Sequence, residues 1–227
     1  MDDIYIVRFS AWACGIENAC EWRQWAEGTR EMIYSDKSPD ILYTDSMFRR
    51  RLSQISKMTI QVVHDLLPLD ENIKMFFLSF RGEVSKQLKI NRMVLEEKSL
   101  MPAVFSLSVF NAPAALASIA FGLKGGYSAL YPGNNSFSSG FAAVKAALLG
   151  GTAEKIVFVY ADEEIPQEYK NIIADNTQPF AFAVILSRFP GHSSVSLSSI
   201  SPDKNESETP QGFLRNLILR KELNAAL

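Results

Sequence analysis

The sequence predicts an α/β fold in which a mixed sheet is layered with helices. Short β-branched and aromatic segments alternate along the chain with longer segments whose apolar residues recur every three or four positions. The composition, with 47% hydrophobic residues, 21% charged residues and a formal net charge of -2, is typical of a globular protein. A chain of 227 residues can also bury a large core without disulfides or a structural metal.

The first half of the chain predicts two strands and three helices. The clearest helix covers residues 46–67, where apolar residues recur at helical spacing and the pattern stops before Pro68. The five predicted elements are a strand at 4–9, helices at 18–29 and 46–67, a strand at 74–80 and a helix at 83–95.

The second half continues the alternation and completes a sheet that we expect to have five strands. Asn111 is a candidate N-cap, with Pro113 in the first turn of the helix that follows. A helix at 136–149 is apolar nearly all round and rich in small residues, so we expect it to be buried. The predicted elements are strands at 104–109, 127–131, 155–161 and 180–186, and helices at 111–121 and 136–149.

The chain divides by composition into one large domain and a short C-terminal part. Residues 1–190 contain the predicted sheet and its helices. Residues 191–210 are rich in Ser, Pro, Asp, Glu and Asn, which predicts a surface loop or linker. Residues 211–227 regain helical spacing and predict a C-terminal helix.

Several functional classes are disfavoured by the sequence. The nearly balanced charge argues against nucleic-acid binding, and the N-terminus lacks the basic and long apolar regions of a signal peptide. The uncharged stretch at 103–123 contains serines and a proline, so we expect no membrane span there. Cys14 and Cys20 lack zinc-site spacing, and no glycine-rich stretch matches a nucleotide-binding motif, so we expect no metal, no cofactor and a cytoplasmic location.

No group of residues forms a recognisable catalytic arrangement. His64, His192, Cys14 and Cys20 are interpreted as ordinary structural or solvated side chains rather than as a base or nucleophile. The acidic run at 162–164, directly after a strand, is interpreted as a solvated turn. A basic patch of three arginines is either a solvent-exposed helix face or a docking site for an acidic partner; it consists of Arg49, Arg50 and Arg51.

Residues 102–163 resemble the N-terminal half of a β-ketoacyl synthase of the thiolase fold. The resemblance rests on the order of a strand, a helix capped by Asn111, a Gly-Leu-x-Gly turn at 122–125, a short strand, a small-residue buried helix and a strand that ends at an acidic residue. In element order it extends over residues 4–186. The motif Ser-Val-x-Asn-Ala at 108–112 is most similar to a short ketosynthase-like family found in aryl polyene gene clusters.

Two departures from the resembled family bear on catalysis. The position of the family's nucleophilic cysteine falls on Asn134, or on Asn135 if the loop is shifted by one residue. An amide cannot form the acyl thioester that covalent condensation requires. The chain also ends before the second half that supplies the family's catalytic histidines, so we expect no catalytic residue in it.

The resemblance therefore implies a subunit similar to a chain-length factor, the inactive partner of a heterodimeric ketosynthase. Its implied partners are a full-length ketosynthase and an acyl-carrier protein, which Arg49, Arg50 and Arg51 would dock. The implied dimer interface is Tyr127, Ser128, Ala129, Leu130 and Tyr131. The residues implied to line the partner's acyl tunnel are Val104, Ser108 and Phe110. Two alternatives stay open: a standalone acyltransferase that uses Cys14 or His64, and a purely structural scaffold of a biosynthetic complex.

Overall fold

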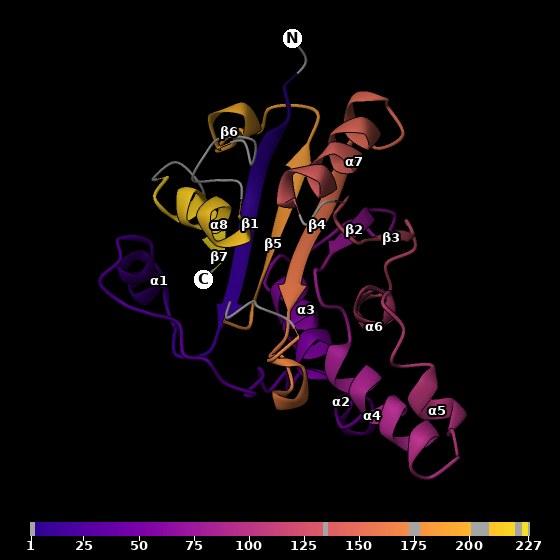
Figure 1. Cartoon of the computed structure of the whole chain (residues 1–227). Helices are drawn as coiled ribbons and strands as arrows, with labels where there is room; N and C mark the ends of the chain where they lie inside the picture. Colours follow the sequence, from indigo (N-terminus) through magenta and orange to yellow (C-terminus); the bar gives the residue numbers. More distant parts are fainter. Residues whose placement is uncertain (1–2, 134–135, 173–177, 201–208, 221–223, 227) are drawn as a thin grey trace.

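The centre of the protein is a mixed sheet with strand order β3-β2-β4-β5-β1-β6, and a seventh strand, β7, pairs with β1 (Figure 1). The computed structural model describes residues 3–133, 136–172, 178–200, 209–220 and 224–226. Neighbouring strands β3, β2 and β4 are parallel, whereas β5 is antiparallel to both β4 and β1. The strands span Tyr5–Ala13 (β1), Lys74–Leu78 (β2), Tyr127–Leu130 (β3), Lys155–Asp162 (β4), Phe180–Ser187 (β5), Val195–Ser196 (β6) and Asn224–Ala226 (β7).

The predicted α/β class and mixed sheet are confirmed, and β1 to β5 correspond to five of the six segments that the sequence predicts as strands. Two further strands bring the number within the described residues to seven. Because β6 has two residues and β7 has three, neither is long enough to show an alternating pattern in the sequence.

Helices cover both faces of the sheet. Buried residues of α1, α7 and α8 pack with one face, and those of α3 and α6 pack with the other. In Figure 1, α4 and α5 extend away from the sheet. The helices span Ala19–Ala26 (α1), Ser46–Arg49 (α2), Gln54–His64 (α3), Val84–Leu95 (α4), Pro102–Phe105 (α5), Ala112–Phe121 (α6), Phe137–Leu149 (α7) and Pro210–Ile218 (α8). Among helices formed by the described residues, none has both the length and the apolar character needed to cross a membrane.

Strands β4 and β5 supply the middle of the core. They are almost completely buried, and their side chains alternate between aromatic or large aliphatic residues on one face and smaller residues on the other. The larger side chains meet an aromatic cluster in which the ring centroids of Phe141 and Phe158 lie 4.4 Å apart and those of Phe141 and Phe213 lie 4.9 Å apart. The C-terminal helix α8 is therefore part of the core through Phe213.

The predicted helix at 46–67 is two helices, α2 and α3. Ser53 caps α3 because its Oγ accepts a hydrogen bond from Ser56 N at 3.2 Å, and Asp45 caps α2 in the same way. Side-chain capping competes with continuation of a helix, and here it separates the two segments. The second helix ends before Pro68, as the sequence predicts. The expected cap at Asn111 is not formed, because its side-chain amide instead donates to the Tyr127 hydroxyl.

The strand predicted at 104–109 is wrong. Residues 102–105 form α5, and the turn continues through a hydrogen bond from Ser108 N to Phe105 O. The β-branched and aromatic composition favours a strand, but Pro102 at the first helical turn favours a helix start.

Helix α7 is buried on one face only. Phe137, Phe141, Val144 and Leu148 face the core, whereas Ala142 and other small residues are exposed. Gly140 lies directly against the Leu78 side chain of β2, with no room for a Cβ atom. The small residues in α7 therefore serve two purposes: Gly140 permits close approach to the sheet, and Ala142 and Ala146 lie on the outer surface.

The C-terminal part is more varied than the predicted single helix at 211–227. Helix α8 ends at Ile218, and residues 224–226 form β7 beside β1, because a free edge of β1 is available for parallel pairing. In the segment predicted as a loop or linker at 191–210, the structure contains β6 and the 3-10 helix η3 (Leu197–Ile200), while residues 201–208 lie outside the described part. The domain boundary at residue 190 stays a prediction.

We expect Phe213→Ala to lower the free energy of unfolding by about 3–5 kcal/mol, because the side chain is fully buried among aromatic rings. Urea denaturation monitored by circular dichroism measures this change. Phe189→Ala is the matched control, because the Phe189 side chain is 55% exposed. Similar losses in both variants would contradict a core role for α8.

Candidate functional site

The carboxyl ends of β2, β3 and β4 meet at one edge of the sheet. Leu78 of β2 pairs in register with Leu130 of β3 on one side and with Tyr160 of β4 on the other. Segments that follow parallel strands lie at the same edge, where α/β proteins commonly place their functional groups. This edge therefore contains the β2–α4 turn, the β3–α7 connection and the acidic residues after β4.

Asp162, at the end of β4, organises this edge. Its carboxylate accepts hydrogen bonds from Ser79 Oγ at 2.5 Å, Tyr160 OH at 2.7 Å, Arg81 N at 2.9 Å and Phe80 N at 3.0 Å. Burial raises the pKa of Asp162, and Arg81 together with the hydroxyl donors acts in the opposite direction. The carboxylate thus fixes the turn after β2 relative to the end of β4.

Glu163 is also buried, so the interpretation of 162–164 as a solvated turn is wrong for its first two residues. Glu163 Oε1 accepts from Ser85 N at 2.8 Å, and its Oε2 accepts from Ile55 N at 3.4 Å. Burial and the nearby Glu83 raise the pKa of Glu163 to about 7. The sequence does not reveal this burial because the two donors, Ile55 N and Ser85 N, belong to α3 and α4, which are distant from Glu163 in the sequence.

The predicted nucleophile position lies between β3 and α7. Asn134 and Asn135 themselves lie outside the described residues, whereas the flanking Gly133 O accepts from Ser136 N at 3.0 Å. The sequence has two cysteines. Cys14 follows β1, four strand spacings from β3 in the sheet order, which is about 19 Å across the sheet. Cys20 is exposed on α1.

The three predicted tunnel residues have different environments. Val104 is half-buried in α5, whereas Ser108 is buried and its Oγ donates to Phe105 O at 2.8 Å. Phe110 contacts the rings of Phe77 and Tyr131, with centroid distances of 6.2 and 6.3 Å. Phe110 thus lies next to the end of β3, Val104 lies on the projecting helix α5, and Ser108 is enclosed.

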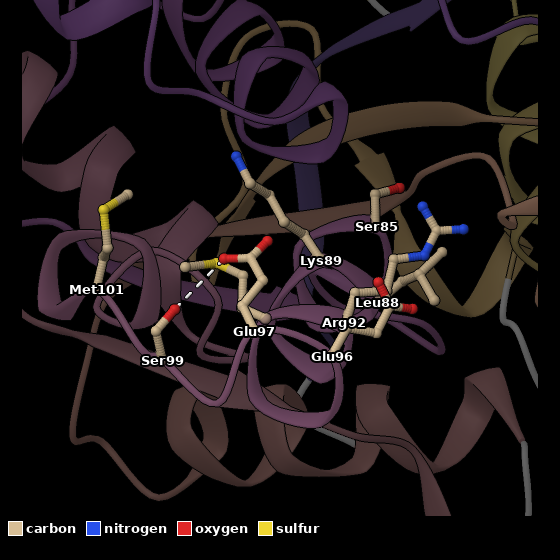
Figure 2. A pocket seen from close by; sticks show the side chains of 9 residues that line it. Ser85, Leu88, Lys89, Arg92, Glu96, Glu97, Ser99 and Met101 are labelled. Carbon is tan, nitrogen blue, oxygen red and sulfur yellow. Dashed lines mark hydrogen bonds between the residues drawn. The ribbon is translucent and has the colours of Figure 1, made fainter.

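The sequence analysis did not identify an apolar surface around α4 and α5. Within residues 94–105, several large apolar side chains are exposed: Val94, Leu95, Leu100, Met101 and Phe105. Beside them, a cavity of about 550 Å³ is formed by one face of α4 together with Ser99 and Met101 (Figure 2). Exposed apolar residues close together in sequence, of which Phe105 lies in the segment misassigned as a strand, are the signal that could have identified this surface.

Strand β3 is the terminal strand of the sheet at this side. Within the described residues it pairs with β2 alone, so its other edge carries unpaired backbone groups. Tyr127 and the three residues that follow are exposed or half-buried, and Tyr131 is 62% exposed. All five predicted interface residues therefore lie at an accessible edge.

The three arginines of the predicted basic patch differ in exposure and in hydrogen bonding. Arg49 Nη1 donates to Thr44 O at 2.8 Å, so this guanidinium stabilises the preceding loop. Arg50 and Arg51 are exposed. They are the two arginines whose exposure suits an acidic partner.

The two histidines lie in different environments. His64 stacks on Tyr43 with a centroid distance of 3.6 Å, and its Nδ1 lies 3.1 Å from Asp65 Oδ1. His192 is exposed in the loop after β5. Within the described ranges, no group of three or more His, Cys, Asp or Glu side chains is arranged to hold a metal ion.

The sequence matches the family described as beta-ketoacyl synthase, N-terminal domain, over residues 22–221. The chain belongs to this β-ketoacyl synthase family. No curated protein shows significant sequence similarity to it.

Solved ketosynthase structures share its fold. A chain of the complex of a ketosynthase (ApeO) with its chain length factor (ApeC) from Xenorhabdus doucetiae matches with a TM-score of 0.73 and 24% identity, covering 95% of this chain and 91% of that chain. The ishigamide ketosynthase/chain length factor matches with a TM-score of 0.63 and 14% identity, covering 82% and 62%. AntDE:AntF, a type II PKS acyl-carrier protein in complex with its ketosynthase bound to the hexaketide, matches at 0.61 and 16%, covering 82% and 64%.

The likeness shows that this β-ketoacyl synthase family member has the thiolase-like ketosynthase fold that its sequence resembles. The chain spans less than two thirds of the matched chain in the ishigamide and AntDE:AntF structures. It spans nearly all of the matched chain in the ApeO and ApeC complex.

We expect Asp162→Asn to lower the free energy of unfolding by about 3–5 kcal/mol, because the amide removes a buried charge beside Arg81 and turns one acceptor oxygen into a donor. Chemical denaturation measures the loss. Asp70→Asn is the control, since Asp70 is exposed and its side chain accepts one hydrogen bond, from Asn72 N. A change below about 0.5 kcal/mol in Asp162→Asn, the size usual for surface sites, would refute the organising role of this carboxylate.

Proposed function

We propose that the chain is the non-catalytic, chain-length-factor-like subunit of a heterodimeric β-ketoacyl-[acyl-carrier-protein] synthase. It would complete the acyl tunnel of a full-length ketosynthase in polyketide biosynthesis of the aryl polyene type. The observation that carries this proposal is the sequence of the β3–α7 connection, which has Asn134 and Asn135 where the resembled family has its nucleophilic cysteine.

The positions of the two cysteines support the absence of covalent chemistry at that connection. Cys14 follows β1, which β2, β4 and β5 separate from β3 in the sheet order, and Cys20 lies on α1, so neither cysteine belongs to the β3–α7 connection. His64 is held between Tyr43 and Asp65 on α3. This arrangement disfavours the alternative of a standalone acyltransferase that uses Cys14 or His64.

Chain length is a second support. The match to the complex of ApeO with ApeC covers 95% of this chain and 91% of the other, so the two chains are of similar length. A short ketosynthase-like chain therefore occurs in a complex whose description contains both a ketosynthase and a chain length factor.

The surface of the protein suits a partner at the β3 edge. The open edge of Tyr127–Leu130 provides backbone groups for strand pairing, and the exposed apolar residues of α4 and α5 project from the same half of the sheet. We infer that Val104 and the exposed Phe105 enter the partner, and that Phe110 contributes from the base of this segment. Ser108 is buried within this chain, so it is a weaker candidate for lining the partner's tunnel.

An acyl-carrier protein is the second proposed partner. The description of AntDE:AntF contains a carrier protein together with its ketosynthase. Exposed Arg50 and Arg51 would attract acidic side chains of such a protein, while Arg49 holds the loop that presents them. We place the assembly in the cytoplasm.

We expect the chain to co-purify with an untagged full-length ketosynthase from an aryl polyene cluster and to show no acyl transfer on its own. Native mass spectrometry measures the complex, and a carrier-protein acylation assay measures activity with and without the partner. Acylated protein formed by the isolated chain, with turnover, would favour the acyltransferase alternative instead.

We expect Val104→Phe to shorten the products of the reconstituted complex by at least one extension unit, because added bulk at a tunnel end excludes further carbons. Mass spectrometry of the released acyl chains measures the length. Leu219→Phe is the control, since Leu219 is 39% exposed and follows α8, which packs with α1 rather than with α4 or α5. Unchanged lengths in an intact complex would favour a purely structural scaffold.

A further inference from the structure

The N-termini of α3 and α4 converge on two buried carboxylates at the end of β4. We call Glu83, Lys86 and Glu163 the junction cluster, and residues 84–105 the α4–α5 arm. Glu83 immediately precedes α4, Lys86 lies in its first turn, and Glu163 follows β4. The cluster thus joins three elements that are distant in sequence.

Glu83 connects α4 to the start of α3. Its Oε1 accepts from Ser56 Oγ at 2.6 Å and from Ser53 Oγ at 2.8 Å. Its other oxygen, Oε2, has no hydrogen-bond partner among the described residues, although the side chain is fully buried. The nearest charge is Lys86 Nζ at 3.7 Å, which likewise has no hydrogen-bond partner there.

Glu163 connects the same two helices to β4. It accepts from the backbone of Ile55 and Ser85, the second residues of α3 and α4. Two carboxylates thus share one ammonium group in a buried space, and one oxygen of Glu83 makes no hydrogen bond. Such an arrangement favours retention of a proton by one carboxylate, since like charges disfavour joint ionisation.

Other ionisable groups surround the cluster from each packed element. Arg81 Nη1 donates to Glu163 O at 2.7 Å, and Glu164 is paired with Lys170 at 3.8 Å. The remaining groups are Asp162 at the end of β4, Lys89 on α4, and Asp36, which lines a second surface cavity together with Lys86 and Glu163. None of these contacts supplies the hydrogen bond that Glu83 Oε2 lacks.

The attachment of α4 depends strongly on this junction. Along its 12 residues, only Val84, Ile90 and Met93 are buried. The remaining tethers are polar and largely exposed: a hydrogen bond from Gln87 to Ser108 O, one from Asn91 to Tyr169, and an ion pair between Arg92 and Glu168. A change in the junction cluster therefore acts on the base of the whole arm.

We propose that the junction cluster is a proton-linked hinge, which holds the α4–α5 arm closed when one of its two carboxylates is protonated and loosens the arm when both are ionised. The hinge is a property of this chain alone. Its consequence for assembly, weaker binding of the ketosynthase at higher pH, rests on the proposed function.

The direction of the effect follows from proton linkage. The pKa of Glu163 is raised from 4.5 to about 7 in the closed junction, and burial also raises the pKa of Glu83. The closed state therefore binds more protons, so its extra stability is fully present below about pH 4.5 and is lost as pH rises through about 7. Burial lowers the pKa of Lys86, whereas the charges of Glu83 and Glu163 act in the opposite direction.

Hydrogen exchange of the α4 amides tests the hinge on the isolated full chain. Observed rates between about pH 5 and pH 8, divided by the intrinsic rate at each pH, give the opening equilibrium of residues 84–95. We expect this opening to increase by roughly tenfold or more over the interval, with most of the change between about pH 5 and pH 7 and little further change above it.

Two variants and one control separate the hinge from general destabilisation. Glu163→Gln cannot ionise at this position, so we expect a clearly smaller pH dependence of its opening, with the remainder due to Glu83. Glu83→Gln removes the like charge beside Glu163. We therefore expect the pH midpoint of the opening to move to lower pH. Glu97→Gln on the exposed end of the arm should keep the original pH dependence. A flat profile for the unmodified protein, or an unchanged slope in Glu163→Gln, would overturn the proposal.

Binding of the full-length ketosynthase at the same pH values tests the consequence. We expect its Kd to rise with pH for the unmodified chain and to rise clearly less for Glu163→Gln. A pH-independent Kd alongside pH-dependent exchange would overturn the link to assembly while the hinge stands. No binding at any pH, with the exchange result intact, would overturn the proposed function instead.

Discussion

The buried carboxylate of Asp162 is the interaction on which the candidate site depends. It collects donors from its own strand and from the turn after β2, and so sets the position from which α4 begins. A buried charge is stable only where enough donors and an opposite charge compensate for lost hydration, and Arg81 with the two hydroxyls does so here. The proposed partner surface, through α4 and α5, is built on this fixed point.

The sequence is sufficient to predict the parts of the fold that depend on local pattern. Strands β4 and β5 are continuous apolar runs, and α3 and α6 have helical periodicity or clear stop signals, so their existence follows from the residues themselves. Residues 104–109 show where prediction from local pattern fails. Their composition suits a strand, but a strand needs a neighbour, and pairing is decided by tertiary structure rather than by composition.

The candidate site was harder to predict, because its central acids depend on distant partners. Asp162 and Glu163 resemble a solvated turn in sequence, and they are buried because donors approach from residues 53–56 and 79–85. The family resemblance, in contrast, depends on element order and short motifs, which are visible in the sequence. It was therefore confirmed over most of the chain, whereas the environment of each side chain required the structure.

The open edge of β3 has a consequence for the life of this protein in the cell. Unpaired strand backbone beside exposed apolar side chains is a template for aggregation and a target for proteases whenever nothing covers it. If the proposed ketosynthase covers this edge, copies made in excess of it would be short-lived or insoluble. The amount of this protein in the cell would then follow the amount of its partner, because copies with an uncovered β3 edge would be removed.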